Sequence, residues 1–278
     1  MISRIPVSVW GTGDMAMHSL PAEHGYGVET ASDPARIPPG IAAEALSRYT
    51  PPQGRLLDPD CGSGVALVEA LRLGRHAVGA TRSPRWWRVA RNNVNAAKFL
   101  GAGGDGMVLE PTDSAPALLG ESIDLVLTAV RTFATEPGAT AHLIRTLRWC
   151  RPVLRPGGVV VLVAPPRRRS DVLLDLPNCM YVAGQSVGLR PVERAIAVTA
   201  ELRGDQLVAH ASLPQRRFAE RQARRLGRKS SVPAHWDVAV FVAPKQQHRA
   251  AAPSLDGVAP GRLIETFSGS HAARRQAA

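Results

Sequence analysis

The sequence predicts an α/β protein built on a doubly wound, mostly parallel sheet. Short apolar segments typical of buried strands alternate with longer segments whose apolar residues recur every three or four positions, as in amphipathic helices. A Gly-rich turn at residues 62–64 follows the first of these strands, where doubly wound folds bind nucleotide-like ligands. Further on, two strand-like segments flank Gly204-Asp205, which indicates an antiparallel hairpin.

The expected elements lie in one domain. Helices are predicted at residues 41–49, 65–73, 84–100 and 139–154, parallel strands at 55–57, 77–80, 107–109, 123–127 and 159–163, and antiparallel strands at 194–202, 206–211 and 236–242. The domain is expected over residues 26–244. Residues 1–25 show no periodicity and are predicted to be an irregular lead-in. Residues 245–278 have few large apolar side chains and are predicted to be a disordered tail.

The composition indicates which binding partners and which cellular compartment to expect. A formal net charge of +11 favours a polyanionic partner such as DNA or RNA, but only three of the basic residues are lysines, and an arginine-rich composition also arises from GC-rich coding. Cys61, Cys150 and Cys179 are far apart and lack metal-ligand spacing, so three free thiols, no metal and a reducing, cytoplasmic compartment are expected. No signal peptide or membrane span is predicted, because the longest apolar run is too short to cross a bilayer.

The most specific motif joins the first strand to the following helix. Glycines at positions 62 and 64 let the backbone turn sharply and approach a ligand, and the next helix presents free amide donors. A Gly-x-Gly turn alone is equally expected where no ligand binds. The full motif is longer and reads Leu56-Leu57-Asp58-Pro59-Asp60-Cys61-Gly62-Ser63-Gly64.

This motif resembles the loop of the amino-methyltransferases that modify cytosine N4 or adenine N6 in DNA, whose usual form is Asp-Pro-Phe/Met-Cys-Gly-Ser/Ile-Gly-Thr-Thr. Residues 31–39, 83–86, 153–158 and 188–194 also resemble family segments in the family's order, so the resemblance spans about residues 26–243. It implies the class I methyltransferase Rossmann-like fold, a mostly parallel seven-stranded sheet closed by an antiparallel hairpin. It also implies S-adenosylmethionine as the cofactor.

The same resemblance implies which residues hold the cofactor. Asp58 and the glycines of the loop would contact its methionine part, Thr81 stands where the family has a ribose-binding carboxylate, and Asp113 stands beside the adenine amine or is a solvated loop residue. Because Thr81 lacks a charge and a second oxygen, we expect about 1.5–3 kcal/mol less cofactor affinity unless another group replaces the bond. The implied cofactor residues are Asp58, Pro59, Cys61, Gly62, Ser63, Gly64, Thr81 and Asp113.

The catalytic motif of the family is missing. Family members end the fourth strand with Ser/Asp/Asn-Pro-Pro-Tyr/Phe/Trp, which draws on the hydrogens of the base amine and stacks on the extruded base. This chain has Ala129, Val130, Arg131 and Thr132 there, so we expect ordinary base N-methylation to be impaired or abolished. Arg131 would also place a cation near the cofactor's sulfonium. Two further departures are Asp33, where the family has His, and Asp60, where it has Phe or Met.

Two clusters of arginines are candidate phosphate contacts. Residues 216–229 form a basic segment whose helical spacing places most charges on one broad face, although a solvated surface is equally expected. The candidate nucleic-acid-binding residues are Arg167, Arg168, Arg169, Arg217, Arg221, Arg224 and Arg225.

Three functions remain open at this point. The first is an S-adenosylmethionine-dependent methyltransferase with nucleic acid as its substrate. The second is a catalytically inactive relative that binds cofactor, nucleic acid or a protein partner. The third is a methyltransferase for RNA guanine or a small molecule. The sequence indicates no membrane partner and no particular oligomeric state.

Overall fold

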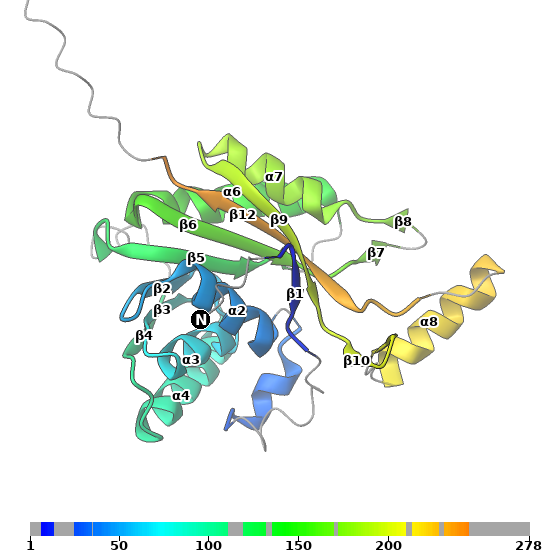
Figure 1. Ribbon diagram of the computed structural model, residues 1–278, viewed down its shortest axis with the longest axis horizontal. Helices are drawn as coiled ribbons and strands as arrows, with labels where there is room; N and C mark the ends of the chain where they lie inside the picture. Colours follow the sequence, from blue (N-terminus) through cyan, green and yellow to red (C-terminus); the bar gives the residue numbers. More distant parts are fainter. Residues whose placement is uncertain are drawn as a thin grey trace, which may run out of the picture. The chain divides into compact units, whose positions relative to one another are not determined.

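The computed structural model (Figure 1) describes residues 7–13, 25–34, 36–110, 119–131, 135–169, 172–209, 213–227 and 231–244. Every described residue belongs to one compact unit, Met1–Lys245. The predicted tail at 245–278 and the candidate residues Asp113 and Thr132 lie outside the described residues.

A single large sheet forms the centre of the first unit, with the strand order β1-β9-β12-β6-β5-β2-β3-β4. Its parallel part consists of β2 (Arg55–Asp58), β3 (His76–Ala80), β4 (Gly106–Leu109), β5 (Ile123–Ala129) and β6 (Leu154–Ala164). Strand β12 (His235–Val242) lies antiparallel between β6 and β9 (Arg190–Val198). The predicted doubly wound, mostly parallel sheet closed by antiparallel strands is therefore confirmed.

Helices cover both faces of this sheet. On one face α2 (Pro39–Tyr49), α3 (Val65–Arg72) and α4 (Pro84–Phe99) pack on a core that includes Leu56, Leu125 and Val161. On the other, α6 (Glu136–Cys150) and α7 (Leu176–Ser186) pack on a core that includes Val126 and Phe241. All seven residues of β5 are buried, which explains why five of them are apolar; Asp124 and Thr128 are the two polar members. Short 3₁₀ helices, η1 (Val28–Ser32) and η2 (Arg151–Val153), precede α2 and β6.

The sequence pattern indicates no strand before residue 55, but the structure differs. Strand β1 (Val9–Gly11) pairs in parallel with β9 and makes the sheet eight-stranded, not seven-stranded. Its Trp10 side chain is fully buried and packs against Tyr49, while Thr12 donates to the carbonyl of Val198 at 2.8 Å. The prediction of an irregular lead-in is wrong at these residues, because a three-residue strand is too short to show a period.

The predicted hairpin is only partly correct. The turn at Gly204-Asp205 does join two antiparallel strands, β10 (Glu201–Arg203) and β11 (Gln206–Val208), but these form a separate small sheet. The strand expected at 194–202 lies mostly in β9, and its antiparallel partner in the main sheet is β12. Ala195 and Ala197 of β9 are buried in the main core, whereas β10 is exposed along its length. The main sheet therefore stops where the chain leaves the core, which is before the turn at Gly204-Asp205.

Three further elements lie outside the main sheet. Strands β7 (Arg168–Arg169) and β8 (Val172–Leu173) form a second small antiparallel pair, and α8 (Leu213–Leu226) contains most of the basic segment.

The packing of α7 on β12 can be tested at Gly184, which faces the buried Phe241 ring. A Cβ at Gly184 would lie 2.4 Å from Phe241 Cε1. Replacing a helical glycine with alanine normally stabilises by about 1 kcal/mol, whereas overpacking a core costs about 1–3 kcal/mol. We expect Gly184→Ala to lower the free energy of unfolding in urea by roughly 1–2 kcal/mol. Gly103→Ala is the control, because its Cβ would meet only the Gly74 Cα at 3.6 Å. A Gly184→Ala variant as stable as the wild type would contradict this packing.

Candidate cofactor site

The predicted cofactor loop lies between β2 and α3, at the carboxyl edge of the sheet. The Cys61 amide donates to the carbonyl of Ala80 at 2.9 Å, and the Gly64 amide donates to the carbonyl of Cys61 at 2.8 Å. Gly64 has φ +80° and is the N-cap of α3, so the helix begins directly where the loop turns back. A Cβ at Gly64 would lie 2.9 Å from the Ala90 Cβ of α4. Glycine is therefore required there by both conformation and space.

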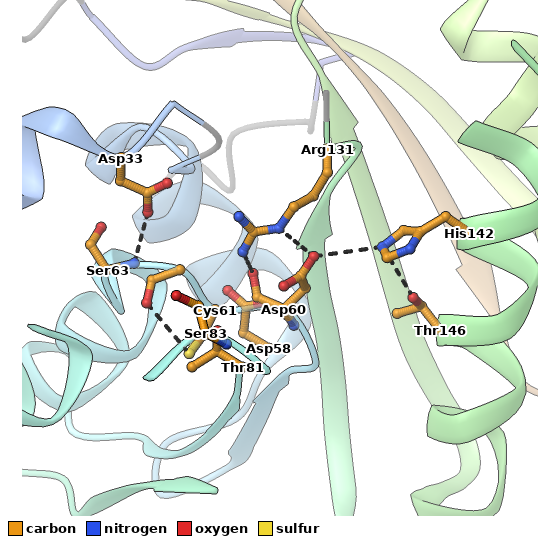
Figure 2. Close-up of polar contacts among 11 residues, drawn as sticks. Asp33, Asp58, Asp60, Cys61, Ser63, Thr81, Ser83, Arg131, His142 and Thr146 are labelled. Atoms are coloured by element: carbon orange, nitrogen blue, oxygen red, sulfur yellow. Dashed lines mark hydrogen bonds and ion pairs between the residues drawn. The ribbon is translucent and has the colours of Figure 1, made fainter. Parts of the chain in front are cut away.

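Asp33 closes the loop from the opposite side. Its carboxylate accepts a hydrogen bond from the Ser63 amide at 2.7 Å (Figure 2). The same oxygen would lie 2.3 Å from a Cβ at Gly62, whose φ is +52°. Asp33 is buried just after η1, so its charge is held against the backbone of the loop. The residue that departs from the family's His thus has a definite structural role here.

Asn93 of α4 ties these segments together and was not singled out from the sequence. Its side-chain amide donates to the carbonyl of Ser63 at 2.8 Å and to the Thr30 hydroxyl at 2.9 Å. Its oxygen accepts from the Gly27 amide at 2.7 Å. A buried Asn on the apolar face of the predicted helix 84–100, among Ala90 and Val94, was the available signal.

Asp58 ends β2 with its carboxylate buried beneath the loop. Burial raises the pKa of Asp58 to about 7, and the charges of Asp60 and Asp33 act in the same direction. The Asp60 amide, which donates to this carboxylate at 3.2 Å, and the Arg131 guanidinium oppose the shift. Near neutral pH this carboxyl lies close to its titration point, and a nearby cation would favour its ionised form.

Arg131, at the end of β5, is directed onto the loop rather than toward open space (Figure 2). Its Nε donates to the Asp60 carboxylate, and its Nη2 donates to the Asp60 carbonyl at 2.6 Å. His142 of α6 places Nε2 3.6 Å from the same carboxylate. Burial alone would raise the pKa of Asp60, but His142 and Arg131 outweigh it and hold that pKa below its usual value.

Two departures from the family motif therefore compensate each other. The cation that the sequence places at the end of the fourth parallel strand is paired with the carboxylate that replaces the family's Phe or Met. Ala129 and Val130 are buried, and the Val130 amide donates to the carbonyl of Val163 at 2.8 Å, so this segment continues the strand pairing. Within residues 129–131, no side chain is arranged to clamp an acceptor base.

The remaining predicted loop residues are placed as follows. Thr81 is buried, and its hydroxyl accepts from the Ser83 amide at 3.3 Å. The Ser63 hydroxyl is buried and, within the described part of the chain, has no hydrogen-bond partner. Burial raises the pKa of the Cys61 thiol well above its usual value, so it stays protonated at neutral pH.

S-adenosylmethionine carries a cationic sulfonium and an ammonium group, and the residues present fit such a ligand. Asp58 and Asp60 within the loop and Asp33 beside it provide three carboxylates, and the Ser63 hydroxyl, which has no hydrogen-bond partner among the described residues, can bind a polar group. Gly62 and Gly64 keep the loop backbone free of side chains. The ribose position differs, because Thr81 provides a hydroxyl in place of a carboxylate.

The arginines proposed for nucleic-acid binding lie on elements other than the cofactor loop. Arg168 and Arg169 are exposed on β7, and Arg167 precedes them. The others are exposed on α8; they are Arg217, Arg221, Arg224 and Arg225. Among the described helices, none combines the length and the apolar character needed to span a bilayer.

Part of the chain is similar in sequence to known proteins. No protein-family model matches the chain. It is 35% identical over 129 residues to ubiquinone biosynthesis O-methyltransferases of Cereibacter sphaeroides, a match covering 44% of this chain and 47% of those proteins. The chain thus spans about half the length of the curated relatives it matches.

Solved structures extend the comparison. The chain superposes on the [4+2]-cyclase SpnF with a TM-score of 0.51 at 15% identity, covering 86% of this chain and 89% of that one. A methyltransferase described as S-adenosylmethionine-dependent, from Methanosarcina mazei, gives a TM-score of 0.49 at 13% identity, with 72% and 97% covered. Since SpnF is named a cyclase, likeness of fold does not by itself assign a reaction.

The sheet order and the turn after β2 define a protein with the class I methyltransferase fold. The chain shares the fold of class I S-adenosylmethionine-dependent methyltransferases, and the partial sequence match supports the predicted cofactor. They do not single out the DNA amino-methyltransferases that the loop motif resembles.

The buried carboxyl of Asp58 predicts how stability depends on pH. Since the pKa of about 7 lies above that of an unfolded-chain Asp, the native state holds a proton that the unfolded state has lost between about pH 4 and pH 7. Its contribution to the free energy of unfolding therefore falls as pH rises through this window. We expect Asp58→Asn, which cannot titrate, to be more stable than the wild type at pH 8 by roughly 2–4 kcal/mol in urea unfolding.

The control is Asp205→Asn in the exposed β10–β11 turn, which should leave the pH profile of stability unchanged. If Asp58→Asn and the wild type show parallel profiles from pH 4 to pH 8, the Asp58 carboxyl is not buried as the structure places it.

Proposed function

We propose that this chain is an S-adenosylmethionine-dependent methyltransferase that acts on a small molecule rather than on a base in DNA. The observation that carries the proposal is the loop from Asp58 to Gly64, whose two glycines and surrounding carboxylates fit a cationic cofactor. Bound there, S-adenosylmethionine would supply an electrophilic methyl group. Asp58 would face its ammonium group, Ser63 would bind a polar atom, and Thr81 would meet the ribose.

The pairing of Arg131 with Asp60 supports this function. An unpaired guanidinium beside a sulfonium would weaken cofactor binding, but the carboxylate of Asp60 balances that charge. The ion pair also fixes the Asp60 carbonyl, and hence the loop, from the side of β5. On this proposal Arg131 is a positioning residue for the loop.

An oxygen acceptor fits better than an exocyclic amine. The motif that draws on the hydrogens of a base amine is missing from residues 129–131, whereas a hydroxyl acceptor does not need that motif. The relatives that the chain matches over part of its length are named O-methyltransferases. Methyl transfer would then depend mainly on proximity and orientation at the carboxyl edge of the sheet.

The charge balance can be tested by calorimetric titration with S-adenosylmethionine and with S-adenosylhomocysteine, which lacks the sulfonium charge. We expect both to bind the wild type. In Asp60→Asn, Arg131 keeps its charge without a counter-charge, so the affinity for S-adenosylmethionine should fall roughly tenfold more than that for S-adenosylhomocysteine.

The matched variant is Arg131→Met, in which the unbalanced charge is negative. In this variant the affinity for S-adenosylmethionine, compared with that for S-adenosylhomocysteine, should rise above its wild-type ratio. Failure of both ligands to bind the folded wild type would refute the proposed function. Equal losses for the two ligands in Asp60→Asn would refute only the electrostatic role of the pair.

A second candidate function is methylation of a nucleic acid, which the arginines of α8 favour. Arg217, Arg221 and Arg224 follow helical spacing, are exposed, and lie beside Phe218, whose side chain is 48% exposed. Such a face can neutralise phosphates while an aromatic ring contacts an unpaired base. The same surface would serve an inactive relative that only binds nucleic acid.

This surface predicts a salt-dependent affinity for duplex DNA or single-stranded RNA. If Arg217, Arg221, Arg224 and Arg225 each contact one phosphate, the logarithm of the binding constant should fall with the logarithm of salt concentration with a slope of about −4 for duplex DNA. Replacing all four with Gln should flatten that slope in fluorescence anisotropy titrations. Arg145→Gln with Arg148→Gln, exposed arginines of α6, is the control. A slope that survives the fourfold variant would exclude α8 as the contact.

A further inference from the structure

A cavity of about 320 Å³ opens beside the last residues of β6, separate from the loop after β2. Its sheet side is formed by β12 and β9, and the register pairs Asp237 of β12 with Ala164, the last residue of β6. The carboxyl end of β6 and the start of β12 therefore meet at the same edge of the sheet. This is the edge that also carries the cofactor loop.

Much of the cavity wall is apolar. Pro166 follows β6, Leu173 belongs to β8, and Leu176 and Pro177 begin α7. Leu173 is 53% exposed, so an apolar side chain faces an accessible hollow. The volume is within the range of small-molecule sites and suits a ligand of about one ring.

Three polar side chains share the sheet side of this cavity. His235 and Asp237 are two residues apart on β12 and so project from the same face, which Phe241 shows to be the face packed against α7. Arg194 of β9 pairs with Ala239 in the register and lies on that face too. The sheet thus presents an imidazole, a carboxylate and a guanidinium over one hollow.

The mixture of charges restricts what can bind. Burial raises the pKa of Asp237, and Asp175 acts in the same direction, while His235 and Arg194 oppose it. An anionic ligand would meet Asp237 and Asp175, and a cationic ligand would meet Arg194. A hydroxyl avoids both conflicts, because it can donate to a carboxylate and accept from a guanidinium.

The cavity lies on the edge of the sheet at which a methyl group would be transferred. The strand order β12-β6-β5-β2 puts β12 three strands from β2, which is about 14 Å at the usual strand spacing. Strand β2 leads into the cofactor loop, and Arg131, just after β5, contacts that loop. A molecule held in the cavity could therefore extend along the edge toward the loop.

We propose that this cavity binds the body of the acceptor, and that the acceptor is a small, neutral, apolar molecule bearing a hydroxyl group. The role as acceptor site rests on the proposed methyltransferase function. The cavity holds one end of the molecule through its apolar walls and through a hydroxyl between Asp237 and Arg194, and the oxygen that receives the methyl group belongs to the other end, toward the cofactor loop. The carboxylates of Asp237 and Asp175 disfavour an anionic ligand, and the guanidinium of Arg194 disfavours a cationic one.

The test compares four ligands of one shape by calorimetric titration into the full chain. The probe is 4-methylphenol. Its matched controls are 4-methylanisole, which cannot donate a hydrogen bond, the anion 4-methylbenzoate and the cation 4-methylbenzylamine. We expect 4-methylphenol to bind at least about tenfold more tightly than each of the other three, since hydrogen bonds to charged groups are worth about that factor.

Two variants test whether 4-methylphenol binds in this cavity. Asp237→Asn should weaken 4-methylphenol binding about tenfold, whereas Asp205→Asn, in the exposed β10–β11 turn, should not change it. Both variants should bind S-adenosylhomocysteine as the wild type does, which shows that they are folded and that the cofactor loop is intact.

The outcomes separate the two proposals. Binding of 4-methylanisole or a charged ligand as tight as that of 4-methylphenol would overturn the hydroxyl selectivity. Wild-type affinity of Asp237→Asn for 4-methylphenol would overturn the placement. If 4-methylphenol binding depends on Asp237 but S-adenosylhomocysteine does not bind the wild type, the ligand site stands and the acceptor role is overturned together with the methyltransferase function.

Discussion

The closure of the loop after β2 is the constraint on which the candidate site depends. Two carboxylates hold the loop from opposite sides: Asp33 accepts from the Ser63 amide, and Asp60 is held by Arg131. Because Gly62 has no side chain, the Asp33 carboxylate can occupy the space that a Cβ at position 62 would fill. A side chain at either of the two glycines would displace Asp33 or α4, so the sequence of the loop and the packing of two distant segments are interdependent.

This closure explains how the chain can differ from the family that its loop resembles without losing the loop itself. Asp33, Asp60 and Arg131 each replace a residue of a different character, and the structure brings all three around one turn. Charge introduced at the end of β5 is balanced by charge introduced in the loop. The base-clamping motif that is missing at residues 129–131 bears on the proposed acceptor, whereas Asp33, Asp60 and Arg131 bear on the loop proposed to hold the cofactor.

Local sequence signals predicted the parallel core well, because β2, β3, β5 and β6 are apolar runs that end in turns and α3 and α4 have clear apolar stripes. They failed where the cause is not local. The three residues of β1 are too few to show a period, and the need for a glycine at position 184 of α7 comes from Phe241, which lies far along the chain. The ion pair between Asp60 and Arg131 joins residues 71 positions apart, and no local sequence pattern near either residue predicts it.

Strand β1 covers only part of the outer strand of the sheet, pairing with Ile196, Ala197 and Val198 of β9. In the described part of the chain, the first half of β9 has a neighbour on one side alone. That half contains Arg190 and Glu193, and Pro191, which lacks an amide hydrogen. Charges and a proline at such a border oppose the addition of a strand from another molecule. The residues that begin β9 therefore disfavour the pairing of this exposed edge with a second copy of the chain.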